Sequence, residues 1–139
     1  MRPLLSRIAA VLLLVLAPHS MALEIVTHPL NSTHSLSVST LRSIFSMRMT
    51  QWPDGTPIRV FVLGDKNPLH AQFSKQILGV FPHQLRRAWN RQIYSGTGQA
   101  PARVESELEM YEMIESTPGA IGYLTEDQES NNVRIIEIE

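Results

Sequence analysis

The sequence contains no cysteine, few aromatic residues (6%) and only one long apolar run among its 139 residues. Without cysteine the chain cannot form a disulfide framework, a Cys-ligated zinc or iron–sulfur site, a thiol nucleophile or a cysteine-linked lipid anchor. The chain is not strongly charged either, because its formal net charge is −1. With 43% apolar and 18% charged residues, a chain of this length is expected to form one domain with a single core.

The one long apolar run covers residues 8–17 and follows two N-terminal arginines. Its length is about half of the roughly 20 residues that a membrane-spanning helix needs. Ser20 and Ala22 supply small residues at the two positions that a signal peptidase recognises. We therefore expect residues 1–22 to be a secretory signal peptide, cleaved after Ala22, and residues 23–139 to form an exported, periplasmic domain.

Charge is divided unevenly along the rest of the chain. Residues 23–104 contain nine Arg and Lys against three acids, whereas residues 105–139 contain ten acids against Arg134. The first part could therefore hold a small anion. The alternative is that Arg86, Arg87 and Arg91 lie on the solvated face of one helix and the glutamates on that of another. A nucleic acid partner is not expected, since the total charge is acidic and the cations are not interleaved with aromatics.

Hydrophobic periodicity and capping residues predict alternating strands and helices. Strands are expected at residues 23–27, 58–63, 120–124 and 133–138, and helices at residues 37–45, 67–78, 82–94 and 106–117. The third helix is expected to bury a stripe of Leu85, Ala88, Trp89 and Ile93, and the fourth a stripe of Leu108, Tyr111 and Ile114. This order predicts an α/β fold, a single three-layer sandwich with a mixed sheet.

Residues spread over this pattern of strands and helices have the order and spacing of a known protein family. They are Leu36-Ser37, Leu41, Ile44-Phe45, Trp52-Pro53-Asp54-Gly55, Pro57-Ile58, Phe73, Trp89, Gly96-Thr97-Gly98, Pro101 and Thr117-Pro118-Gly119-Ala120-Ile121-Gly122-Tyr123. In that order and spacing they resemble the phosphate-binding components of ABC transporters, which are type II periplasmic binding proteins. The resemblance implies one lobe of a two-lobe clamshell. The 117 residues after the signal peptide leave no room for a second lobe, so a buried ligand site would need a homodimer or another protein.

The resemblance also implies where a ligand would bind. In the family, the strand after the Trp-Asp-Gly turn typically leads into Arg-Ser-Asp-Gly-Ser-Gly-Thr, whose arginine, serine, glycine and threonine hold phosphate at a helix N-terminus. Here residues 63–69 are Leu-Gly-Asp-Lys-Asn-Pro-Leu, so Asp65 matches but the arginine becomes Leu63 and the threonine becomes Leu69. Pro68 also removes one backbone donor. Phosphate affinity is therefore expected to be weak.

The candidate ligand-binding residues follow from this loop. They are Asp65, Lys66, Asn67, Leu69 and His70, of which Leu69 and His70 would offer backbone N–H groups, together with Ser32 and Thr33 from the first loop. The alternative for the 65–70 segment is an ordinary capped start of a helix. Arg86 and Arg87 are expected on a different helix, outside this site.

Other chemical motifs are weak. His28, His34, His70 and His83 lack the spacing of metal ligands and are expected in loops or at the surface. The glutamates of residues 105–115 fit the solvated face of a helix better than a pair of catalytic carboxylates. No Ser, His and Asp residues stand within the sequence motifs that mark a catalytic triad. We expect no metal, no cofactor and no enzymatic activity.

Two functions therefore stay open. The first is a periplasmic solute-binding protein of the phosphate-transport type, which binds a small anion weakly and serves a membrane transporter. The second is a periplasmic interaction or sensory module that keeps the fold without the ligand and contacts a membrane sensor protein.

Overall fold

The computed structural model describes residues 22–96, 98–126 and 132–139. The expected signal peptide, apart from Ala22, lies outside the described residues, and so does Thr97 of the Gly-Thr-Gly turn. Within the described ranges, no helix has the length and apolar character needed to cross a membrane.

Six strands and five helical segments make up the described part of the chain. In chain order they are β1 (Leu23–Thr27), β2 (Ser35–Leu36), α1 (Val38–Phe45), β3 (Arg59–Val62), α2 (Pro68–Gln72), the π-helical η2 (Phe73–Leu78), α3 (Pro82–Tyr94), β4 (Ala102–Arg103), α4 (Glu107–Ser116), β5 (Ala120–Thr125) and β6 (Arg134–Ile138). The sequence predicted the four longer strands and all the helices to within a few residues. It missed β2 and β4, because two-residue strands carry no periodicity.

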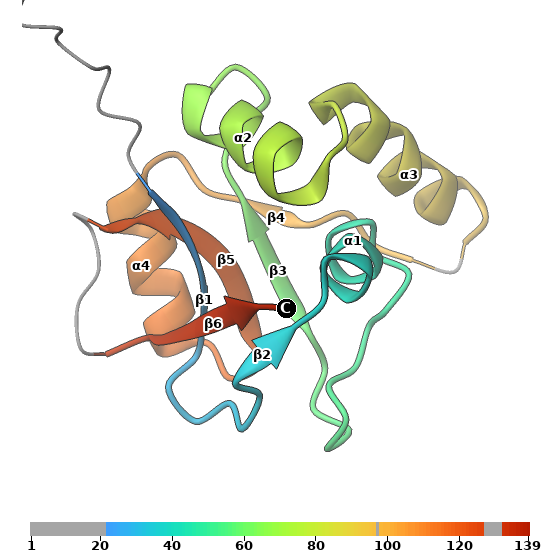
Figure 1. The fold of residues 1–139 in the computed structure, drawn as a ribbon. Coiled ribbons are helices and arrows are strands. Elements are labelled where there is room, and N and C mark those ends of the chain that lie inside the picture. The colour runs from blue at the N-terminus through green and yellow to red at the C-terminus, as the bar shows by residue number, and fades with distance from the viewer. Residues whose placement is uncertain (1–21, 97, 127–131) are drawn as a thin grey trace, which may run out of the picture.

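The strands form one mixed sheet in the order β2-β6-β1-β5-β3-β4. β1 is antiparallel to both of its neighbours, whereas the β3–β5, β3–β4 and β2–β6 pairs are parallel. The carboxyl ends of β3, β4 and β5 therefore meet at one edge of the sheet, and the carboxyl end of β1 lies at the opposite edge. Figure 1 shows the β3–α2 connection at the top and the β1–β2 loop at the bottom.

Helices cover both faces of this sheet, which confirms the expected three-layer α/β sandwich. α4 lies on one face, where a Cβ on Gly122 would collide with Met110 and Ile114, so the absence of a side chain on β5 lets the helix approach. α1, α2, η2 and α3 lie on the other face (Figure 1). There the ring of Tyr123 stacks on Phe73 with centroids 3.9 Å apart.

Two parts of the sequence motif meet on this scaffold. The indole Nε1 of Trp52 donates a hydrogen bond to the carbonyl oxygen of Gly119 at 2.9 Å. Gly119 has φ +80°, and a Cβ there would collide with the carbonyl oxygen of Pro57. Only glycine suits a left-handed conformation at such a close backbone approach. The motif residues around 52–57 and 117–119 thus join the start of β3 to the start of β5.

The predicted helix stripes are partly wrong. Leu85 and Trp89 are buried, but Ile93 is 44% exposed. It lies in the last turn of α3, where residues 93–96 are all exposed as the chain leaves the helix layer. On α4 the buried side chains are Met110 and Ile114, whereas Leu108 is 60% exposed. The space above Gly122 accepts residues 110 and 114, which are four apart and share one helix face, and this turns Leu108 toward solvent.

Replacing Trp89 tests the helix layer. The side chain is 9% exposed, and its Nε1 donates to the carbonyl oxygen of Phe45 at 2.7 Å, so it joins α3 to the end of α1. Trp89→Ala is expected to lower the free energy of unfolding by about 3–5 kcal/mol. Tyr94→Ala on the same helix, where the side chain is 88% exposed, should change it by less than about 0.5 kcal/mol. Chemical denaturation measures both values, and equal effects would contradict this packing.

Candidate functional site

The candidate site is built on the turn between β3 and α2. β3 is a run of mainly β-branched and aromatic residues that suits a buried strand, and beyond it the N–H of Asn67 donates to the carbonyl oxygen of Gly64 at 2.9 Å. The side chain of Asn67 then accepts a hydrogen bond from the N–H of Leu69 at 2.9 Å, and Pro68 occupies the first helical position. A capped helix start thus fixes the turn at the carboxyl edge of the sheet.

A groove of about 510 Å³ opens beside this turn, and we call it the cationic groove. Its walls come from the end of β3 and the following turn, from α3, and from the segment that enters β4. The lining residues are Val62, Leu63, Gly64, Asp65, Lys66, Arg86, Trp89, Ala100, Pro101 and Arg103. The carboxyl ends of parallel strands are where open α/β sheets bind ligands.

Three cations and one carboxylate line the cationic groove. Lys66 comes from the turn, Arg86 from α3 and Arg103 from β4. The guanidinium of Arg103 lies over Gly64, close enough to collide with a Cβ at that position. Asp65 is the one acid among the described lining residues, and its Oδ2 lies 2.9 Å from Nη2 of Arg86. Just outside the lining, Oε1 of Glu105 lies 3.5 Å from Nε of Arg103. The lining therefore carries an excess of positive charge.

A buried hydrogen-bond network lies directly beneath the turn. The hydroxyl oxygen of Tyr123 accepts the N–H of Leu63 at 2.9 Å, and the same hydroxyl lies 2.5 Å from Nδ1 of His70. Nε2 of His70 lies 3.6 Å from Oδ1 of Asp65. A tyrosine on β5 and a histidine on α2 thus connect the core to the carboxylate in the groove.

Burial controls the protonation of this network. Desolvation lowers the pKa of His70, and the nearby Asp65 carboxylate opposes the change only in part. Desolvation likewise raises the pKa of Tyr123 well above its ordinary value. Near neutral pH both groups are therefore uncharged, and the charge in the network sits on Asp65 and Arg86.

The structure separates the residues that the sequence proposed together. Asp65 and Lys66 line the groove. The N–H of Leu69, by contrast, already donates a hydrogen bond to the side chain of Asn67, so it is not open to an anion. Ser32 and Thr33 lie in the β1–β2 loop at the opposite edge of the sheet (Figure 1). The two loops therefore do not form one site.

The side chain of His70 is fully buried, which corrects its expected place in a loop or at the surface, and His28 is buried too, while His34 and His83 are exposed. Within the part of the chain that the structure describes, no group of three His, Asp or Glu side chains could hold a metal ion.

Sequence reasoning missed two of the cations. Arg86 was expected outside the site, but the turn of α3 that carries it lies against Asp65. Arg103 belongs to a two-residue strand without a sequence signal of its own. Tyr123 is the one member of the buried network that the sequence motif contains, although the motif did not reveal its role.

The fold defines the class of this protein: an α/β lobe with a groove at the carboxyl edge of a mixed sheet. The family model for the PBP superfamily domain matches residues 15–135, and the chain belongs to this family. A comparison with curated proteins gave no match.

Solved structures share the fold at low sequence identity. An ABC-type phosphate transport receptor from Vibrio cholerae is 16% identical, with a TM-score of 0.67 over 85% of this chain and 46% of that chain. A putative phosphate ABC transporter substrate-binding protein with bound phosphate from Clostridium perfringens is 17% identical, with a TM-score of 0.68 over 85% and 45%. PstS from Borrelia burgdorferi is 18% identical, with a TM-score of 0.67 over 86% and 47%. The chain thus spans about half the length of these structures.

The buried His70 makes stability depend on pH. Because its pKa is lowered in the folded state, the unfolded chain binds a proton that the folded chain does not, and stability falls as pH drops below the ordinary histidine value. Between pH 8 and pH 5, wild type should lose stability relative to His70→Gln, by at most about 1.4 kcal/mol per pH unit. Denaturation at several pH values measures this difference. Parallel pH profiles for the two proteins would contradict it.

Proposed function

We propose that this protein binds a small oxyanion, phosphate or a close analogue, in the cationic groove, as an exported solute-binding protein. The observation that carries the proposal is the convergence of Lys66, Arg86 and Arg103 from three separate elements on one turn. Guanidinium groups match the geometry of phosphate oxygens, and an ammonium adds a compact charge. The phosphate-binding descriptions of the relatives with this fold support the same ligand class.

The expected affinity is low. Arg86 and Arg103 have side chains that are 56% and 66% exposed, and Lys66 is exposed as well. Exposed ion pairs contribute up to about 1 kcal/mol each, so three of them give at most about 3 kcal/mol, which corresponds to a dissociation constant of roughly 6 mM or weaker. Salt should weaken the binding further.

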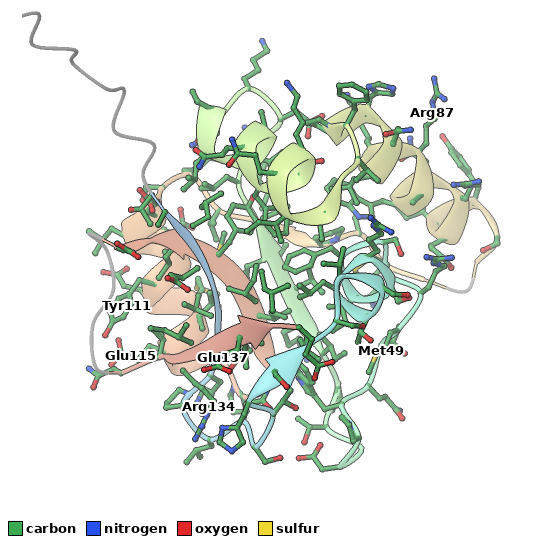
Figure 2. All side chains as sticks on the ribbon, in the orientation of Figure 1. Met49, Arg87, Tyr111, Glu115, Arg134 and Glu137 are labelled. Atoms are coloured by element: carbon green, nitrogen blue, oxygen red, sulfur yellow. The ribbon has the colours of Figure 1, made fainter. Side chains whose placement is uncertain are left out.

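A second candidate is a module that binds a partner protein without a solute. Its support is the exposed surface around α3: Phe81 just before the helix and Tyr94 at its last residue are 53% and 88% exposed, and Arg87 extends outward (Figure 2). The family's arginine and threonine are also replaced here by Leu63 and Leu69. Binding of phosphate in the groove favours the first candidate, and its absence favours the second.

Phosphate titration followed by NMR tests the proposal. In about 50 mM salt, amide resonances of residues 63–66, 86 and 103 should shift with a millimolar midpoint, and Lys66→Ala with Arg103→Ala should raise that midpoint by about tenfold. Arg87→Ala combined with Arg91→Ala is the matched control, because it also removes two positive charges, from positions of α3 that do not line the groove.

Two results would contradict this proposal. One is a titration with no shift at the groove residues. The other is a protein with Arg87→Ala and Arg91→Ala that loses as much affinity as the groove double variant, which would indicate nonspecific attraction to the basic helix layer.

A further inference from the structure

The hydrogen bonds of Tyr123 assign the tautomer of His70. The hydroxyl oxygen of Tyr123 already accepts the N–H of Leu63, and the hydroxyl has a single proton to donate. Nδ1 of His70, 2.5 Å away, is the acceptor in place for that proton. If Nδ1 carried a proton itself, the buried hydroxyl proton would have no acceptor there. The proton of the neutral imidazole is therefore on Nε2.

The resulting Nε2–H is buried without a hydrogen bond. Among the described residues no acceptor lies within hydrogen-bond range of Nε2, and the His70 side chain is fully shielded from solvent. The charged group that faces it is Asp65, with Oδ1 3.6 Å away, which is too long for a hydrogen bond. A buried unsatisfied donor destabilises the fold, so a small movement of the carboxylate toward Nε2 would be favourable.

Arg86 holds that carboxylate back. Oδ2 of Asp65 lies 2.9 Å from Nη2 of Arg86, on the groove side of the carboxylate. The other groups packed around the imidazole are the ring of Phe73 from η2, the ring of Trp89 from α3 and Tyr123 from β5. Asp65 is thus shared between a buried neutral donor and an exposed cation.

We propose that His70 is a positioning residue of the cationic groove, and that its Nε2–H donates a hydrogen bond to the Asp65 carboxylate when an anion displaces Asp65 from Arg86. This inference rests on the proposed function. An anion at Arg86 competes with Oδ2 of Asp65, and the hydrogen bond that Oδ1 then forms with His70 offsets the loss of that ion pair. Anion binding and the Asp65–His70 hydrogen bond therefore strengthen each other by the same factor.

Two substitutions of His70 separate this role from packing. In His70→Gln the side-chain amide can reach the position of Nε2 and donate to Asp65, whereas in His70→Asn it can reach only the position of Nδ1, beside Tyr123. Each variant keeps one of the two contacts of the imidazole. His70→Gln should bind phosphate about fivefold more tightly than His70→Asn, the effect expected of one hydrogen bond. Equal affinities, or tighter binding by His70→Asn, would overturn the proposal.

NMR of the imidazole in the wild-type protein gives an independent test. The nitrogen resonances should show Nδ1 unprotonated and Nε2 protonated, and added phosphate should move the Nε2 proton downfield as its hydrogen bond to Asp65 forms. A proton on Nδ1 would overturn the proposal, and so would groove amides that shift with phosphate while the Nε2 proton does not.

The Asp65→Asn variant distinguishes this failure from failure of the proposed function. Because it removes the competing carboxylate, phosphate should bind at the groove more tightly than in wild type. If phosphate shifts no groove amide in wild type or in Asp65→Asn, the proposed function itself is wrong.

Discussion

The candidate site depends on the buried hydroxyl of Tyr123. This group lies on the central strand β5 and contacts both ends of the β3–α2 turn, through the N–H of Leu63 at its start and the imidazole of His70 just beyond it. Without this hydroxyl, two buried polar groups would lose their partner, at a cost of about 1–3 kcal/mol each. The turn that presents Asp65 and Lys66 is therefore fixed from beneath by the core rather than by contacts at the surface.

The sheet gives this arrangement its rigidity. Tyr123 stacks on Phe73 on one face of the sheet, and the neighbouring Gly122 lets α4 pack closely on the opposite face. Two successive residues of β5 therefore contact both helical layers. At the other end of the same strand, Gly119 accepts the indole N–H of Trp52. The residues of the family motif thus act as scaffold, while the cations of the groove come from positions outside the motif. The scaffold contacts and the groove cations are thus supplied by different sets of residues.

The sequence predicted what local chemistry determines. Asn67 and Pro68 mark a helix start, Gly79 with φ +69° marks its end, and the stretch at residues 23–27 forms a strand with the expected bounds. The non-local features were harder to predict. The approach of Arg86 to Asp65 depends on how α3 packs, and the burial of His70 depends on a partner 53 residues away. No periodicity or motif contains such information, and the sequence therefore located the turn but did not place Arg86 and Arg103 beside it.

Amide hydrogen exchange at Leu63 tests the central role of Tyr123 most directly. In Tyr123→Phe the ring remains to stack on Phe73 but the acceptor for the Leu63 N–H is gone. The account predicts that exchange at Leu63 becomes at least about tenfold faster relative to the amide of Val60, which lies within β3, with the sheet otherwise preserved. If Leu63 and Val60 keep the same ratio of exchange rates as in wild type, the hydroxyl does not hold the turn, and the account is wrong.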